Sequence, residues 1–159
     1  MNLAHARTLV NRMGIRFTEW TAQRVVATMP VAGNTQPWGL LHGGASCVLA
    51  ETLGSVGAAL HAGPEKFPVG VEISATHHRA AAAGTVTGVA TPLHAGQTLA
   101  TYEIVITDDD GRRVCTARLS CLLRDRIPSM SPLRRDGRAA GSGAGTPGAG
   151  AGDRAGDRA

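Results

Sequence analysis

The chain has 159 residues, and 43% of them are hydrophobic, which is enough for the core of one compact domain. Only 3% are aromatic, so that core must be mainly aliphatic. The formal net charge of +4 comes with a single lysine and no stripe of basic and aromatic residues, which argues against nucleic-acid binding. Cys47, Cys115 and Cys121 form no C-x-x-C pair, as expected for free thiols in the reducing cytoplasm.

The pattern of apolar residues predicts the following elements in chain order. Helical spacing covers residues 2–12 and stops at Gly14, and two strands follow over 15–20 and 24–29. A loop rich in Gly and Pro over 31–41 leads into one long helix over 43–61, which ends before Gly63 and Pro64. Alternation then predicts four strands, over 69–79, 85–92, 99–108 and 114–123, with breaks at 83–84, 94–96 and 109–111. Segregated helices and strands indicate an α+β fold with an antiparallel sheet.

The central helix is apolar on nearly every side and rich in Gly, Ala and Ser. A helix of this kind is buried, and its small side chains allow a sheet to wrap closely around it. Its apolar run of 16 residues, over 45–60, carries Glu51 and is shorter than the ~20 residues of a membrane span. No signal peptide is recognisable at the N-terminus, so we expect no membrane association.

The last part of the chain differs in composition from the rest. Residues 129–159 consist mainly of Ser, Pro, Gly, Ala and Arg and end in the repeat AGDRAGDRA. Such a segment has too little apolar surface to offset the entropy of ordering, so we expect a disordered tail. The folded domain is therefore predicted over residues 1–128.

Glu51 is the first candidate for chemistry because it is the only charged residue between Leu40 and Leu60. An ionised carboxylate is costly to bury unless it is paired or hydrogen-bonded, so Glu51 either has a functional partner or pairs with an Arg at the helix rim. Ser55 lies one turn further on the same face, where its hydroxyl can orient the carboxylate or a water molecule. The alternative for Ser55 is a bond to its own backbone.

The start of the helix, His42-Gly43-Gly44, is the second candidate. The first N–H groups of a helix lack backbone partners, and glycines let a ligand approach them, so a developing oxyanion could bind there. The alternative is a tight turn that simply needs glycine. Gly43 and Glu51 stand about 12 Å apart along one helix axis at ~1.5 Å per residue, too far to act on one carbon atom. A shared site would therefore need two antiparallel helices from two subunits.

Neither a metal site nor a serine-histidine hydrolase fits this sequence. The six histidines show no H-x-x-x-H or H-E-x-x-H spacing, and neighbouring His77 and His78 would point to opposite faces of a strand. Ser46 and Ser55 lack the G-x-S-x-G elbow. We expect no metal.

The stretch QPWGLLHGGASCVLAETLGS, residues 36–55, resembles the active-site segment of hotdog-fold acyl-CoA thioesterases. It is similar to the phenylacetate-type branch, which includes 4-hydroxybenzoyl-CoA and 1,4-dihydroxy-2-naphthoyl-CoA thioesterases. The similarity extends over residues 71–79, 92–96 and 111–119 and covers roughly residues 1–125. The resemblance implies a hotdog fold, an antiparallel sheet wrapped around one long helix, in dimers that usually pair into tetramers.

The resemblance also implies a role for each candidate residue. Glu51 would attack the thioester carbonyl or activate water, and Ser55 would position the carboxylate or that water. The Gly43 N–H, with Gln36 and His42, would polarise the carbonyl oxygen. No cofactor is implied, since CoA is part of the substrate. Substrate and CoA contacts are expected from Gly70, His77, His78, Arg79 and the turn His94, Ala95, Gly96, Gln97 and Thr98. The family usually has Ser, Arg or Lys after the turn glycine and Phe where this chain has Trp38.

The sequence thus predicts a cytoplasmic acyl-CoA thioesterase that forms homodimers or homotetramers and releases a free acid, with aromatic acyl groups favoured by the resemblance. Two alternatives remain. One is a noncatalytic protein that binds acyl-CoA or acyl carrier protein, against which the presence of Glu51 and Gln36 argues. The other is a hotdog dehydratase with His42 as its catalytic histidine, which the spacing of Glu51 and Ser55 fits less well.

Overall fold

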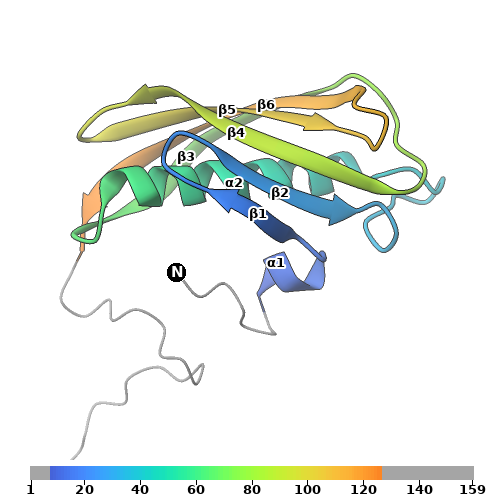
Figure 1. Ribbon diagram of the computed structural model, residues 1–159, viewed down its shortest axis with the longest axis horizontal. Coiled ribbons are helices and arrows are strands. Elements are labelled where there is room, and N and C mark those ends of the chain that lie inside the picture. Colours follow the sequence, from blue (N-terminus) through green and yellow to red (C-terminus); the bar gives the residue numbers. More distant parts are fainter. Residues whose placement is uncertain (1–7, 127–159) are drawn as a thin grey trace, which may run out of the picture.

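The computed structural model describes residues 8–126. The predicted tail 129–159, the end of the predicted domain and residues 2–7 of the predicted N-terminal helix lie outside this range. Within these residues, two helices and six strands follow one another (Figure 1). They are α1 (Leu9–Arg12), β1 (Arg16–Trp20), β2 (Val25–Pro30), α2 (Gly43–Ala62), β3 (Lys66–His77), β4 (Thr85–Ala95), β5 (Leu99–Thr107) and β6 (Arg113–Asp125).

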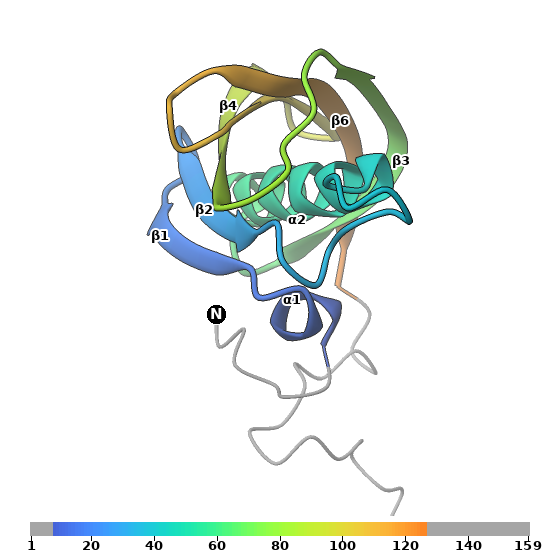
Figure 2. The ribbon, with the colours of Figure 1, turned by 90° about the vertical axis from the view of Figure 1, so that its right-hand side faces the viewer.

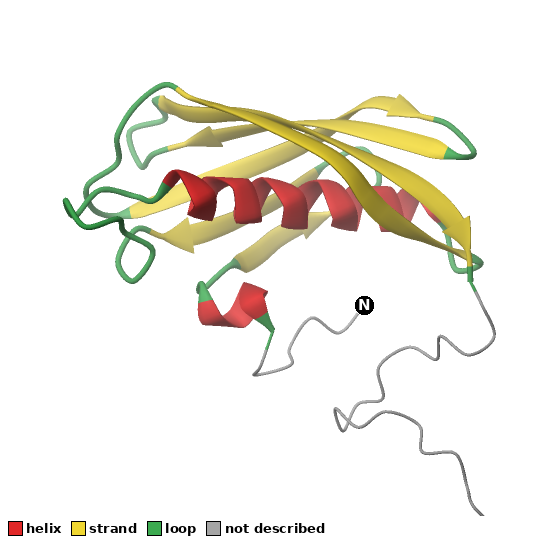
Figure 3. Ribbon diagram, turned by 180° about the vertical axis from the view of Figure 1, so that it is seen from behind, coloured by secondary structure: helices red, strands yellow, loops and turns green. Residues whose placement is uncertain are grey.

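The strands form one sheet in the order β1-β2-β4-β5-β6-β3, and every neighbouring pair is antiparallel. The end-on view shows this sheet curling around α2 (Figure 2). From behind, α2 runs along the inner face of the sheet (Figure 3). The predicted α+β fold, an antiparallel sheet wrapped around one long helix, is confirmed.

Glycines allow the sheet to approach α2 closely, as its composition predicts. A Cβ atom on Gly54 would lie 2.6 Å from Cδ2 of Leu119, and one on Gly57 would lie 2.6 Å from Cε1 of Tyr102. Both partners are buried side chains of the sheet. The close packing at these two positions offsets the helix propensity that each interior glycine costs, about 1 kcal/mol relative to Ala.

Two strands, β3 and β4, differ from the prediction by more than two residues at one end. β4 does not end at Pro92 but continues to Ala95, so His94 and Ala95 lie in a strand and the turn is shorter. The register shifts between Pro92 and His94, and this bulge keeps the strand paired with β5 beyond the proline. β3 starts at Lys66, before Pro68, and ends at His77. Pro68 is tolerated because β3 is at the edge of the sheet.

By length and composition alone, α2 would be able to cross a membrane. In the fold it is the core helix instead, with Leu49, Leu53 and Ala58 fully buried. Its apolar character on several sides is explained by contacts with five strands of the sheet.

Candidate active site

Glu51 lies midway along α2, where its carboxylate meets β3. The Ser55 hydroxyl, one turn further on, donates a hydrogen bond to Glu51 Oε1 at 3.3 Å. The same Oε1 lies 2.5 Å from the position that a Cβ atom on Gly70 would occupy. Sequence reasoning placed Gly70 among the substrate contacts, but within this chain its missing side chain leaves room for the carboxylate. Glu51 therefore has a hydrogen-bond partner and no Arg in contact among the described residues.

Cys121 belongs to the same cluster, and sequence reasoning missed it. It faces Gly70 directly across the pair β3 and β6, and its side chain is fully buried. Burial raises the pKa of the Cys121 thiol, a hydrogen bond with Ser55 lowers it, and the Glu51 charge raises it. The thiol thus stays protonated beside the carboxylate. No signal in the sequence could reveal this contact, because it depends on the register of two strands.

The first turn of α2 is capped by the residue before it. Gly44 N–H donates to Nδ1 of His42 at 2.8 Å. Because Nδ1 accepts this bond, the neutral His42 ring carries its proton on Nε2 and can donate it outward. Among residues 8–126, no acceptor lies at hydrogen-bonding distance from the Gly43 N–H. The start of the helix therefore offers one free N–H donor, that of Gly43.

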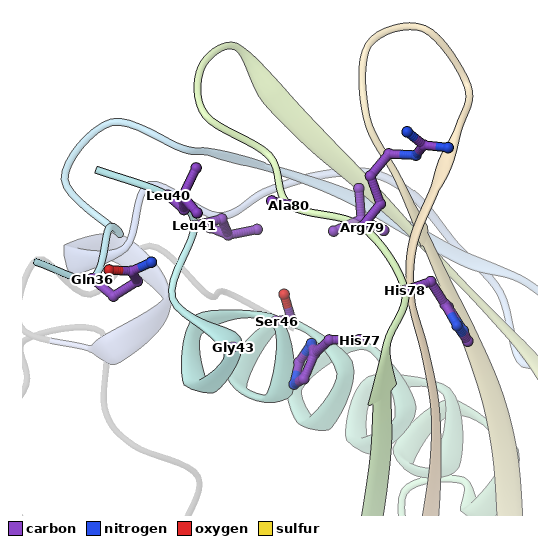
Figure 4. Close-up of a pocket in the computed structure, with 10 residues that line it drawn as sticks. Gln36, Leu40, Leu41, Gly43, Ser46, His77, His78, Arg79 and Ala80 are labelled. Carbon is purple, nitrogen blue, oxygen red and sulfur yellow. The ribbon is translucent and has the colours of Figure 1, made fainter. Parts of the chain in front are cut away.

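A cleft of about 400 Å³ opens beside this helix start (Figure 4). The His77 ring reaches over Gly43, with Nε2 2.9 Å from the position of a Cβ there. His78 turns away and its Nε2 lies 3.0 Å from the Thr116 hydroxyl, so the two histidines do point to different sides. The cleft brings together several predicted residues with apolar neighbours, and its lining is Gln36, Leu40, Leu41, Gly43, Ser46, His77, His78, Arg79, Ala80 and Val114.

Gln36 is held in the loop that borders this cleft. Its Oε1 accepts a hydrogen bond from the Trp38 N–H at 2.6 Å, and its own N–H donates to the Leu40 carbonyl at 2.8 Å. The side-chain amide nitrogen therefore remains as a donor. Ser46, which sequence reasoning considered only as a hydrolase nucleophile, directs its hydroxyl into the same cleft (Figure 4).

The predicted CoA contacts are divided between the two ends of α2. The cleft at the start of α2 is bordered by His77, His78 and Arg79. The turn after β4 lies at the other end of the helix, beside the last turn of α2. His61, in the last turn of α2, donates to the Gly96 carbonyl at 2.9 Å, and Lys66 Nζ donates to the Gln97 carbonyl at 2.8 Å. His94 lies against Gly96, while Ala95 and Thr98 are beside it. One subunit does not unite these residues in a single site.

Gly43 and Glu51 are likewise separated within one subunit. Both belong to the unbroken helix α2, so eight residues place them about 12 Å apart along its axis. Their neighbours on β3 differ accordingly: His77 covers Gly43, whereas Gly70 lies against Glu51. A single carbon atom could meet both groups only if they came from different subunits.

Among the described residues, no three His, Cys, Asp or Glu side chains gather as a metal ion would require. The polar groups available are the carboxylate with its hydroxyl partner, two side-chain donors and the helix N–H. This set suits attack at a carbonyl carbon with stabilisation of the oxygen.

Comparison with known proteins decides the family. The sequence profile described as "Thioesterase superfamily" matches residues 39–115. The proofreading thioesterase EntH of Cronobacter turicensis is 51% identical over 121 residues, which cover 76% of this chain and 88% of the relative. This chain belongs to the thioesterase superfamily. It is therefore a thioester hydrolase, and the noncatalytic and dehydratase alternatives are set aside.

Solved structures of other thioesterases share the fold. The thioesterase HI1161 of Haemophilus influenzae has 35% identity and a TM-score of 0.73, over 76% of this chain and 85% of that one. Thioesterase SAV0944 of Staphylococcus aureus has 31% identity and a TM-score of 0.72, over 75% of this chain and 100% of that one. Of two SAV0944 structures, one has alanine in place of a glutamate. The other has alanine in place of a glutamine that stands fifteen residues before that glutamate.

Proposed function

We propose that this thioesterase hydrolyses acyl-CoA, with water as the second reactant. Water supplies an oxygen atom to the acyl carbonyl carbon, the carbon–sulfur bond breaks, and the CoA thiolate takes up a proton. The proposal rests on the position of Glu51. Its carboxylate accepts a hydrogen bond from the Ser55 hydroxyl and occupies the space that the missing side chain of Gly70 leaves open. The proposed reaction needs no further cofactor.

Glu51 performs the attack in one of two ways that the geometry supports equally. Its free oxygen adds to the carbonyl carbon as a nucleophile, or it accepts a proton from the attacking water as a general base. The Ser55 hydroxyl holds the other oxygen, so the reactive one keeps its direction. A half-buried carboxylate next to apolar helix residues is poorly hydrated and hence reactive.

The start of α2 polarises the carbonyl oxygen. The Gly43 N–H, the Nε2–H of His42 and the side-chain amide of Gln36 are the donors that remain after their local bonds are made. Donors fixed in advance stabilise the developing negative charge without reorganisation during the reaction. An aromatic thioester, whose carbonyl is conjugated and less electrophilic, benefits most from such polarisation. The apolar part of the cleft, with Leu40, Leu41 and Val114, suits an aromatic acyl group.

We infer that each active site combines the helix start of one subunit with Glu51 of another. The ~12 Å between Gly43 and Glu51 supports this arrangement, which requires at least a homodimer. The free edge strand β3, which exposes Val69, Val71 and Ile73, offers an apolar strand for pairing. We further propose a homotetramer, in line with the resemblance, and a cytoplasmic location, in line with the three free cysteines.

The two SAV0944 variants support the choice of residues. Their replaced glutamine and glutamate have the spacing of Gln36 and Glu51, fifteen residues. For the CoA part we propose His77, His78 and Arg79 at one end of α2 and the residues His94–Thr98 at the other. Pairing of two subunits would bring such distant groups to one extended ligand.

The first test is release of free thiol from a panel of acyl-CoAs. The panel runs from acetyl to palmitoyl and includes benzoyl, 4-hydroxybenzoyl, phenylacetyl and dihydroxynaphthoyl groups, with native protein and Glu51→Ala. We expect turnover of an aromatic acyl-CoA by the native protein and none by Glu51→Ala. Full turnover by the variant would contradict the role of Glu51, and turnover of aliphatic substrates alone would contradict the aromatic specificity.

The second test asks whether the site is shared between subunits. Gln36→Ala and Glu51→Ala are purified as inactive proteins, mixed, dissociated and reassociated. In mixed dimers one of the two sites then combines an intact Gln36 with an intact Glu51. We expect recovery of about a quarter of native activity, since half of the dimers are mixed and half of their sites are intact. No recovery in demonstrably mixed dimers would place both residues in one subunit.

A further inference from the structure

The loop that carries the proposed donors to the carbonyl oxygen is not fixed by burial. It runs over residues 31–41, between β2 and α2, and none of residues 32–39 is buried. Gln36 lies in this loop, and His42 and Gly43 follow it directly. An exposed segment stays ordered only where hydrogen bonds offset the entropy that ordering costs. The positions of these donors therefore depend on the hydrogen bonds of the loop.

The Asn34 side chain joins this loop to the rest of the fold. Its Nδ2 donates to the Pro30 carbonyl at 2.8 Å, at the end of β2, and to the Met13 carbonyl at 2.9 Å, at the end of α1. A side-chain amide has two N–H donors, and both are used here. In the described part of the chain, no other side chain of residues 32–40 makes a hydrogen bond outside the loop.

Close packing of Gly14 on Pro30 brings the two acceptors together. A Cβ atom on Gly14 would lie 3.0 Å from Cγ of Pro30, and the φ of Gly14 is +69°, in the left-handed region that favours glycine. The carbonyls of Met13 and Pro30 thus converge on one amide group. Because both partners are carbonyl oxygens, the Asn34 amide presents its nitrogen to them and not its oxygen.

The backbone of Asn34 links the same residue to the start of α2. Its carbonyl accepts the His42 N–H at 2.9 Å, and its own N–H donates to the Val31 carbonyl at 3.0 Å. The base of the loop is therefore closed by the residue whose side chain attaches the loop to β2 and α1. Gln36 follows Asn34 by two residues, and Gly43 comes directly after His42.

We propose that Asn34 is a positioning residue of the active site: its two amide hydrogen bonds hold the loop, and with it the donors to the carbonyl oxygen, in one arrangement. The proposal rests on the proposed function of those donors. Asn34 does not touch the substrate in this scheme and undergoes no chemistry. Donors fixed in advance act on charge that develops in the transition state, so loosening them lowers kcat more than it raises KM.

Two variants separate positioning from packing and from general stability. Asn34→Asp keeps nearly the native size but, when ionised, offers acceptors only, against two carbonyl oxygens. Tyr102→Phe removes a hydroxyl that donates to the Ala22 carbonyl at 2.7 Å. This bond also joins a side chain to the backbone, but it lies at the turn between β1 and β2, at the opposite end of β2 from the loop.

The first experiment measures kcat, KM and Tm of these variants and of Asn34→Ala with the best acyl-CoA of the panel. We expect both Asn34 variants to lower kcat about 10- to 100-fold, the usual cost of misplaced groups, with KM within about threefold of native. Tyr102→Phe should lower Tm by about 4 °C and keep kcat within about twofold. Near-native kcat in Asn34→Asp would overturn the proposal, since a loss in Asn34→Ala alone would be due to the void left by truncation.

Hydrogen exchange tests the loop without relying on catalysis. Peptides covering residues 34–42 and 99–107 are followed in native protein, Asn34→Ala and Tyr102→Phe. We expect faster exchange over 34–42 in Asn34→Ala, because the acceptor of the His42 N–H is no longer held in place, and native exchange over 99–107. Tyr102→Phe should leave 34–42 unchanged. Native exchange over 34–42 in Asn34→Ala, or equal acceleration of both peptides, would contradict the proposal.

A milder variant keeps the test decisive if Asn34→Ala does not fold. Asn34→Ser has one hydroxyl proton, which can serve only one of the two carbonyls. We expect its kcat below native and its exchange over 34–42 above native, and native values of both would overturn the role of Asn34.

Glu51→Ala and Gln36→Ala, assayed beside these variants, separate the two levels of the argument. Full activity of both would refute the proposed function, while the exchange result would still report on the loop. Their inactivity together with native kcat in the Asn34 variants would refute only the role of Asn34.

Discussion

The Glu51 carboxylate occupies the space in which any residue other than glycine at position 70 would place its Cβ atom. Only 2.5 Å separate Glu51 Oε1 from that position. The contact joins the middle of the core helix to the edge strand of the sheet. The position of the Glu51 carboxylate therefore depends on the missing side chain of Gly70 in β3 as much as on the Ser55 hydroxyl of α2.

Gly70→Ala should preserve the fold and impair the reaction. The added methyl group meets the flexible end of Glu51, so the carboxylate moves aside rather than the backbone. Misplaced catalytic groups typically cost about 10- to 100-fold in rate. We expect a fall of kcat in this range with Tm nearly unchanged. Ser74→Ala, an exposed position on the same strand, serves as the control and should keep native kcat. A fully active Gly70→Ala would show that the observed position of Glu51 is not the reactive one.

Ser55→Ala should lower kcat because the carboxylate loses its donor. Hydrogen bonds to charged groups contribute about 1.5–3 kcal/mol, so we expect a fall of roughly 10- to 100-fold. Thr52→Ala is the matched control, since the Thr52 hydroxyl lies on the same helix but donates to the Val48 carbonyl at 2.7 Å. Steady-state kinetics of both variants measures the difference. Equal losses in the two would assign the effect to the helix rather than to Glu51.

His42 has two separable roles, the helix cap and the proposed donor to the carbonyl. His42→Ala removes the acceptor of the Gly44 N–H and should cost about 1 kcal/mol of folding free energy, or about 4 °C in Tm. His42→Asn restores a good cap but not the outward Nε2–H. We expect native Tm with reduced kcat for the asparagine variant, measured by thermal unfolding and thiol release. Native kcat in this variant would reduce His42 to a cap.

Alkaline pH should destabilise the protein through Cys115. Burial, followed by the nearby Cys47 thiol, raises the pKa of Cys115 to about 11. In the unfolded chain a thiol has a pKa of about 8.5. Between these values the unfolded state has lost its proton and the folded state has kept it, so stability falls as pH rises through this window. We expect a smaller drop of Tm between pH 8 and pH 10.5 in Cys115→Ala. An equal drop in both proteins would assign the destabilisation to other groups.

Local patterns in the sequence are sufficient for most of the fold. Apolar alternation and breaker residues predict β1, β2, β5 and β6 within two residues, and Gly63 with Pro64 ends α2 as expected. The end of β4 is mispredicted because a bulge carries the strand past Pro92, and such a shift depends on the partner strand β5. The composition of the central helix predicts that a sheet wraps around it, because small side chains let the strands approach the helix closely.

The candidate site follows from the sequence only in part. Glu51 and Ser55 are paired by helical spacing, and Gly43 stands at a helix start, because the α-helix has a fixed geometry. Gly70 and Cys121 are fifty-one residues apart in sequence and meet only through the register of β3 and β6. The sequence by itself therefore determines which helix face bears the carboxylate. Tertiary structure alone decides what surrounds that carboxylate, because contacts between strands depend on long-range pairing that no local pattern encodes.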